Sequence, residues 1–169
     1  EIILKQINDN SIREEILDMM SYQDKLDKTY IQLYNLGALN RSNVKRALFD
    51  ECGELNHEMK KEWCYWKKSQ KPIDRAAVLE ELSDVFHFSL TLHMMDFGKT
   101  FDNMWLEMYR DYHKDDDWFT LLDCISRGTK FGLYLCVILS EKLNFTFDEV
   151  YNSYLEKNAK NYQRIEDGY

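Results

Sequence analysis

Apolar residues recur three or four positions apart along most of the chain, which is the spacing of one face of an α-helix. The first such segment covers residues 11–36. Ser11 followed by Glu14 forms a capping box that predicts its start, and Gly37 is a natural stop. Its apolar side chains at this spacing are Ile16, Met19, Met20, Leu26, Tyr30, Leu33 and Leu36.

The remaining sequence divides into further helical segments in the same way. Asp74 is expected to cap one of them, and Thr146 with Glu149 forms a second capping box. The chain has one proline and six glycines, which is too few for a protein rich in strands and tight turns. We therefore predict an all-α bundle of five or six helices in a single domain over residues 1–169. The expected helices are 11–36, 42–66, 74–96, a shorter one from 100 or 102 to 112, 118–143 and 146–164.

Charge and composition exclude several classes of protein. The formal net charge is −8, which argues against a nucleic-acid surface because phosphate binding by side chains requires clustered Lys and Arg. No apolar run approaches the 18 or so residues of a membrane span, and no signal peptide is visible. The four cysteines show neither CxxC nor zinc-ligand spacing, which predicts free thiols in a reducing compartment. We expect a cytoplasmic protein without nucleic-acid or membrane partners.

Candidate chemistry is concentrated in two pairs of acids, Glu51-x-x-Glu54 and Glu81-x-x-Asp84. Residues three apart project from neighbouring positions on one helix face, so each pair forms a platform of two carboxylates. Both pairs border the apolar stripe of their helix. Four carboxylates facing each other across antiparallel helices would repel, and hard cations such as Mg²⁺ or Mn²⁺ would relieve that repulsion. Two such ions together are a recognised device for hydrolysing phosphoric anhydrides.

Three other interpretations remain open at this point. Each acid pair alone is more typical of a solvated helix face. Glu54-x-x-His57 and Asp84-x-x-His87 have the acid-x-x-His spacing of di-iron bundles, although such a site needs two more glutamates from other helices. A non-catalytic helical module that binds another protein is the third interpretation.

Four sequence elements resemble one known family. Beyond the ExxE…ExxD signature of the all-α nucleoside triphosphate pyrophosphatases, the chain is similar to the dimeric dUTP diphosphatases. Upstream it has Gln23-Asp-Lys-Leu-Asp27, similar to the Q-x-x-L-[ND] element of that family. Between the acid pairs lies Trp63-Cys-Tyr-Trp66-Lys67, and Asp84-Val-Phe-His87-Phe88 matches D-x-x-H-F. The C-terminal segment 157–169 matches K-N-x-x-N-x-x-R-x-x-x-G-Y. Residues 98–144 carry no motif of the family, and Ile165 stands where the family often has Gln.

The resemblance implies an all-α homodimer that hydrolyses dUTP to dUMP and pyrophosphate. It implies two or three Mg²⁺ ions, with Mn²⁺ as a substitute, on Glu51, Glu54, Glu81 and Asp84. Glu51, or alternatively Glu54, would accept the proton of the attacking water. Another nucleotide substrate, such as dCTP or a modified nucleotide, is the alternative within the superfamily. The implied phosphate-binding residues are Lys157, Asn161, Arg164, Tyr169 and Lys67, and the implied base-binding residues are Gln23, His87, Asn158, Trp63 and Trp66.

Each of these assignments also has a plainer interpretation. Basic residues in the last turns of a helix complement its dipole, and lysines in loops are usually solvated. The two tryptophans are equally consistent with core or dimer packing. His57 is expected to be exposed.

Overall fold

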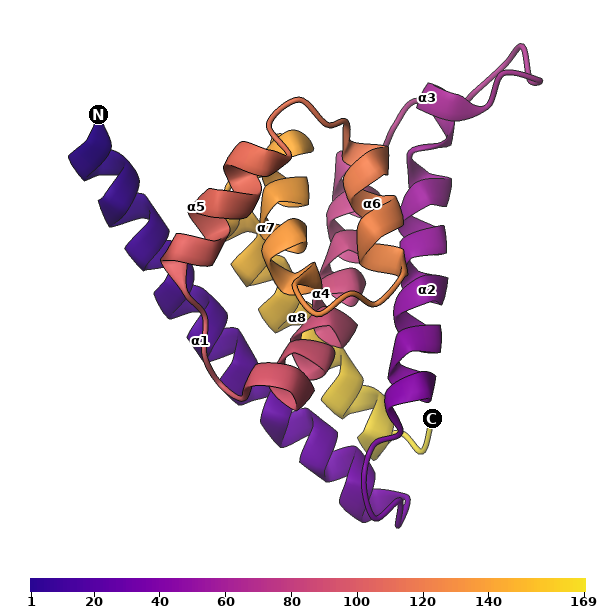
Figure 1. The fold of residues 1–169 in the computed structure, drawn as a ribbon. Coiled ribbons are helices and arrows are strands. Elements are labelled where there is room, and N and C mark those ends of the chain that lie inside the picture. The colour runs from indigo at the N-terminus through magenta and orange to yellow at the C-terminus, as the bar shows by residue number, and fades with distance from the viewer.

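A computed structural model describes residues 1–169 and contains helices but no strand (Figure 1). This confirms the all-α prediction. The helices are α1 (Ile2–Leu33), α2 (Arg41–Glu58), α3 (Lys60–Trp63), α4 (Arg75–Phe97), α5 (Asn103–Tyr112), α6 (Trp118–Ser126), α7 (Gly132–Lys142) and α8 (Phe147–Glu166).

Three of the predicted helix starts are confirmed in detail. The Asp74 carboxylate accepts hydrogen bonds from the N–H groups of Ala76 and Ala77 and so caps α4. Asp102 caps α5 in the same way. Thr146 and Glu149 form a reciprocal capping box at the start of α8. These caps satisfy N–H groups that have no partner within their own helix.

The start of α1 was predicted wrongly. The helix begins nine residues before Ser11, so the supposed capping box lies inside it. Contacts with α5 hold the additional turns. The Arg110 guanidinium reaches both oxygens of the buried Asp9 carboxylate at 3.2 Å, and Lys5 pairs with Glu107 at 3.1 Å. Tertiary ion pairs therefore override the local capping signal.

Two other predicted helices, 42–66 and 118–143, are interrupted. The first ends at Glu58 and gives way to the single turn of α3. The second is divided into α6 and α7 by Gly128, whose φ of +65° lies in the left-handed region. A Cβ at Gly128 would also lie 2.9 Å from Cγ of Lys45 on α2. The glycine thus permits both the turn and the close approach of α2.

The core forms one cluster of 31 buried hydrophobic residues. α4 and α7 lie inside the bundle and are apolar on most sides, as expected for helices surrounded by others. α2, α8 and α1 pack against α4. Because α4 carries both Glu81 and Asp84, this packing brings α2 and α8 to opposite sides of its acid pair.

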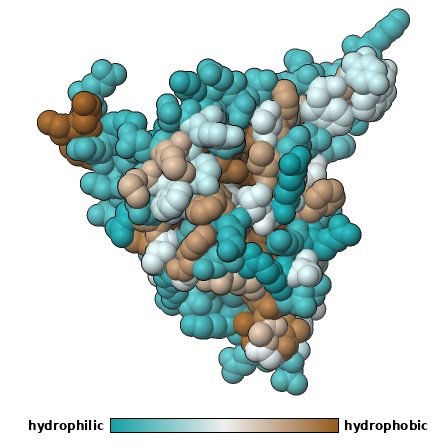
Figure 2. Space-filling view, viewed as in Figure 1, coloured by the Kyte–Doolittle hydropathy of each residue, from teal (hydrophilic) through white to brown (hydrophobic).

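The four cysteines are unpaired, as predicted. None of the helices combines the length and apolar character needed to cross a bilayer. Figure 2 shows a mostly hydrophilic face with hydrophobic side chains gathered at the N-terminal tip of α1, where Ile2, Ile3 and Leu4 are exposed.

Candidate active site

A cavity of about 750 Å³ opens between α1, α2, α4 and α8. This volume lies in the range of small-molecule sites. The cavity brings together segments that are distant in sequence, because the C-terminal residue Tyr169 lies beside the end of α1. The Tyr34 hydroxyl donates to the Tyr169 backbone carbonyl oxygen at 3.3 Å. Nine of the predicted site residues line the cavity: Glu51, Glu54, Glu81, Asp84, His87, Lys157, Asn161, Arg164 and Tyr169.

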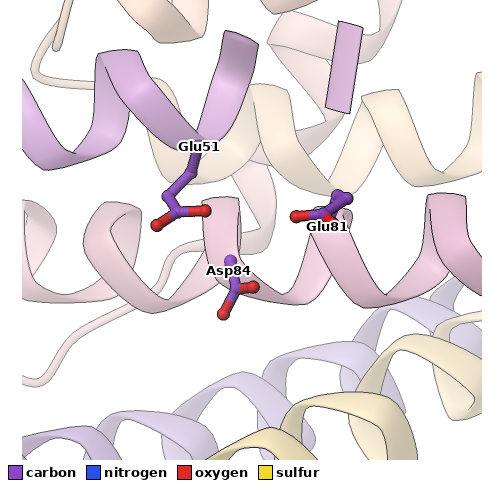
Figure 3. A group of neighbouring side chains, drawn as sticks. All are labelled: Glu51, Glu81 and Asp84. Atoms are coloured by element: carbon purple, nitrogen blue, oxygen red, sulfur yellow. The ribbon is translucent and has the colours of Figure 1, made fainter. Parts of the chain in front are cut away.

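Three of the predicted carboxylates converge on one point. Glu51 projects from α2 toward Glu81 and Asp84 on α4 (Figure 3). One oxygen from each lies within 4.8 Å of the others. Glu54 lies one turn further along α2, lines the same cavity and is exposed. Spacing of three residues on α4 and packing of α2 against it produce this group.

Burial and mutual repulsion perturb these acids. Burial, together with the charges of Asp84, Glu54 and Glu81, raises the pKa of Glu51 to about 7. Burial and the nearby Glu54 and Asp84 raise the pKa of Glu81 to about 7 as well. The pKa of Asp84 is also raised by burial, although Lys157 opposes the shift. The group therefore resists carrying its full negative charge without added positive charge.

α8 supplies the opposite wall of the cavity. Lys157, Asn161 and Arg164 follow i, i+4, i+7 spacing and share a face. Nζ of Lys157 lies 2.6 Å from the Asp84 carboxylate and 3.2 Å from that of Glu80. The Arg164 guanidinium lies 5.3 Å from the ring centre of Tyr169 and forms no ion pair within the protein. Its donors remain available for an anionic ligand.

The charge of the cavity fits divalent cations. Six carboxylates line it, against only two cationic side chains, Lys157 and Arg164. A nucleoside triphosphate would be repelled by this excess of negative charge unless cations entered with it. The clustered donors are all carboxylate oxygens, which suit Mg²⁺ or Mn²⁺ better than soft metals. His57 is exposed and belongs to no such group, so the di-iron arrangement lacks one of its expected ligands.

A polar network extends from residues that line the cavity to buried residues behind them. The fully buried Gln23 donates from Nε2 to the Asp27 carboxylate at 2.9 Å and lies at the same distance from Nε2 of His87. Its Oε1 accepts from the Tyr154 hydroxyl at 2.8 Å. The Thr91 hydroxyl donates to the other Asp27 oxygen at 2.8 Å. Each polar atom of Gln23 is therefore engaged within the protein.

Five predicted site residues do not line the cavity. Gln23 and Asn158 are buried behind it, and Nδ2 of Asn158 has no hydrogen-bond partner. Trp63, Trp66 and Lys67 lie in α3 and the connection that follows it. Trp63 donates from Nε1 to the Asn56 carbonyl oxygen, and Trp66 is 59% exposed. Sequence proximity to the acid pairs does not bring this segment to the cavity of the same chain.

Several lining residues were missed from the sequence. Asp27, Tyr30 and Tyr34 continue the α1 face that Gln23 begins, and Thr91 lies one turn beyond His87. Helical spacing from the motif residues could have found these four. Val44 lies seven residues before Glu51 on α2, so helical spacing could have found it too. Leu36 and Leu39 could not have been found in this way, because they lie in the α1–α2 connection. The ring of Phe88, centred 4.7 Å from that of His87, also lines the cavity.

Comparison with known proteins agrees with this geometry. No curated protein matches the chain. A family model described as dUTPase matches residues 15–169, which include both acid pairs, the network behind the cavity and the cationic face of α8. The chain therefore belongs to the all-α dUTPase family and is a dUTP diphosphatase.

Proposed function

We propose that the chain converts dUTP to dUMP and pyrophosphate by metal-assisted attack of water on the α-phosphorus. The observation that carries this proposal is the juxtaposition of three convergent carboxylates with the cationic face of α8 across one cavity. Acids and cations on opposite walls suit a ligand that arrives as a complex of triphosphate and metal.

Glu51, Glu81 and Asp84, with Glu54 beside them, would hold two or three Mg²⁺ ions. Bound there, the ions would neutralise phosphate charge and lower the pKa of a coordinated water. Arg164 offers a planar pair of donors to phosphate oxygens. Lys157 pairs with Asp84 and Glu80 in this structure. If bound ions neutralised these carboxylates instead, Lys157 would be free to bind the phosphates.

The bond formed joins the water oxygen to the α-phosphorus, and the bond broken joins that phosphorus to the oxygen bridging to the β-phosphate. Pyrophosphate leaves with the electron pair. Glu51, whose half-buried carboxylate projects from α2 toward the acids of α4, accepts the proton of the water. Glu54, which stands outside the group of three, is the alternative acceptor.

The base would occupy the end of the cavity beside His87 and Phe88. The Phe88 ring offers a face for stacking, and Tyr30 and Tyr34, whose rings stack 6.1 Å apart, border the same space. His87 and Asn161 offer polar atoms to the edge of the base. Trp63 and Trp66, assigned to the base from the sequence, are replaced in this role by Phe88.

The test is release of pyrophosphate from dUTP, dTTP, dCTP and UTP, each with and without Mg²⁺. We expect magnesium-dependent release from dUTP alone, and its loss in Glu54→Gln. Glu58→Gln is the matched control, because Glu58 is on the same helix, one turn away, and does not line the cavity. Release from dCTP or from several nucleotides would retain the chemistry and overturn the preference for uracil. Release from dUTP without any metal would overturn the metal assignment.

We also propose that the protein is a homodimer. The resemblance implies it, and the α3 connection exposes large aromatic side chains that a second copy would cover, with Tyr65 exposed by 92% and Trp66 by 59%. Sedimentation equilibrium at micromolar concentration should give twice the mass of the chain, and Trp66→Ala should shift it toward the monomer. A monomeric wild-type protein would contradict the proposal.

A further inference from the structure

Asp27 fixes the orientation of the Gln23 amide. Burial raises the pKa of Asp27 to about 6, so the carboxyl is mostly ionised at about pH 7.5 and can only accept hydrogen bonds. The Gln23 atom that faces it at 2.9 Å must therefore be the amide nitrogen. In this orientation the Tyr154 hydroxyl, 2.8 Å away on the other side, donates to Oε1.

The second hydrogen of the Gln23 amide nitrogen then determines the tautomer of His87. That nitrogen lies 2.9 Å from Nε2 of His87, so Nε2 must be an unprotonated acceptor. Burial, with the charge of Lys157, lowers the pKa of His87 to about 4, and the ring is neutral. A neutral imidazole with an unprotonated Nε2 carries its one proton on Nδ1.

Nδ1 is the ring nitrogen on the Asn161 side, and Asn161 lines the cavity. The Asn161 amide nitrogen lies 3.5 Å from Nδ1, and its side chain makes no other hydrogen bond. A 180° turn of this amide would present its oxygen to the Nδ1 proton. The Nδ1–H group is therefore free to exchange the weak Asn161 contact for a ligand acceptor.

We propose that Asp27, Gln23 and Tyr154 are positioning residues that hold His87 as the Nδ1–H tautomer, and that this donor selects a carbonyl at C4 of the base. The inference rests on the proposed function. Uracil carries oxygen at C4, which accepts from Nδ1–H. Cytosine carries an amino group there, which sets a donor against a donor and leaves buried groups unpaired. Selection against cytosine thus originates in the ionised Asp27, which lines the cavity and contacts the buried Gln23.

Asp27→Asn tests this series of hydrogen bonds, because the isosteric amide can either donate or accept. Gln23 can then turn its oxygen toward His87, and the tautomer is no longer determined. ¹⁵N spectra of the imidazole rings, with His87 assigned from the His87→Gln variant, report the protonated nitrogen directly. We expect protonated Nδ1 in the wild type and a mixture of tautomers in Asp27→Asn. Protonated Nε2 in the wild type would overturn the proposal.

A second experiment measures base selectivity by comparing kcat/KM for dUTP and dCTP. We expect the dUTP:dCTP ratio to fall by at least roughly tenfold in Asp27→Asn, through faster dCTP cleavage relative to dUTP. Tyr154→Phe removes only the hydroxyl that donates to Gln23 and should shift the ratio in the same direction by less. Asp24→Asn is the matched control, because Asp24 is on the same helix and pairs with Lys28 and Lys99 outside the cavity.

The possible outcomes distinguish a failure of the proposed function from a failure of the positioning role of Asp27, Gln23 and Tyr154. If wild-type protein releases no pyrophosphate from dUTP, the proposed function and its base selectivity fail together, while the ¹⁵N spectra still decide the tautomer. If the wild type cleaves dUTP and Asp27→Asn changes neither tautomer nor ratio, the positioning role is overturned. If the tautomer mixes and the ratio is unchanged, the role of the tautomer in selectivity is overturned.

Discussion

Two groups of crowded carboxylates contact α8, one at its first turn and one at its middle. One is the group of Glu51, Glu81 and Asp84 in the cavity. The other, here called the α1–α8 acidic cluster, consists of Glu14, Glu15, Asp18 and Asp148, where α1 meets the first turn of α8. Burial and a neighbouring acid raise the pKa of Glu15 to about 7, as for Glu51 and Glu81. Perturbed acids alone therefore do not distinguish the two groups.

Their surroundings distinguish them. In the cavity group, Asp84 pairs directly with Lys157, and Arg164 lines the same cavity. No member of the α1–α8 acidic cluster forms an ion pair with Lys or Arg. Glu15 instead lies beside Asp148 in the first turn of α8, where the helix dipole favours negative charge. The Tyr151 hydroxyl donates to Asp18. Helix packing thus explains the α1–α8 acidic cluster. The cavity group is the candidate active site because cationic side chains line the same cavity.

The largest expected effect separates the two groups by activity. Glu81→Gln removes one of three convergent charges without changing shape, and we expect kcat/KM for dUTP to fall by roughly 10²–10³-fold, as when one preorganised electrostatic group is lost. Glu15→Gln should leave kcat/KM for dUTP within about twofold of the wild-type value. Pyrophosphate release at saturating Mg²⁺ measures both. Equal losses in the two variants would break the comparison.

Substitution of Arg164, on the cationic face of α8, should give the second-largest loss of activity. Arg164→Lys keeps the charge but loses the planar pair of donors, so we expect a loss of roughly 10-fold in kcat/KM, and roughly 100-fold for Arg164→Ala. Lys160→Ala is the control, because Lys160 is on the same helix and pairs with Glu80 but does not line the cavity. Full activity of Arg164→Ala would remove the feature that separates the two acidic groups.

The same contrast shows what the sequence could predict. Glu81 with Asp84, and Lys157 with Arg164, are brought together by helical spacing within one element, and periodicity is enough to place them. The convergence of Glu51 on the α4 pair requires α2 to pack antiparallel to α4, which two matched acid motifs indicated. Local geometry therefore accounts for most of the cavity walls.

What could not be predicted depends on contacts between distant elements. Gln23 was expected to touch the base, but its polar atoms are engaged by His87 on α4 and Tyr154 on α8, as well as by Asp27 on its own helix. Trp63 and Trp66 were assigned to the base because their segment, between the acid pairs, resembles that of the family. The break after Glu58 directs them elsewhere. The division at Gly128 depends on the approach of Lys45, which no local pattern reveals.

The stabilisation of the folded protein by Mg²⁺ should also distinguish the cavity group from the α1–α8 acidic cluster. Ions bound by the cavity group relieve repulsion that is present only in the folded state, so binding stabilises the protein by mass action. At about 100 times the dissociation constant this amounts to about 2.7 kcal/mol, or about 5–10 °C in Tm for a chain of this size. Thermal unfolding with and without Mg²⁺ measures the shift. It should nearly vanish in Glu81→Gln and persist in Glu15→Gln, and a shift that persists in both would place the ions elsewhere.

The smallest expected effect is the pH dependence of stability at the α1–α8 acidic cluster. The pKa of Glu15 is raised from 4.5 to about 7 in the folded protein. Between these values the folded state binds more protons than the unfolded state, so stability declines as pH rises through about 7. Solvent screening limits the contribution of this partly exposed group to about 1 kcal/mol.

Glu15→Gln removes that ionisation. It should therefore stabilise the protein by about 1 kcal/mol at about pH 8 and have little effect at about pH 3, where the glutamate is largely protonated in both states. Urea unfolding of wild type and variant at the two pH values measures the difference. A destabilisation at about pH 8 that disappears at low pH would reverse the sign and show that Glu15 is held as a carboxylate. In that case a cation would have to face it, and the α1–α8 acidic cluster would no longer differ from the cavity group.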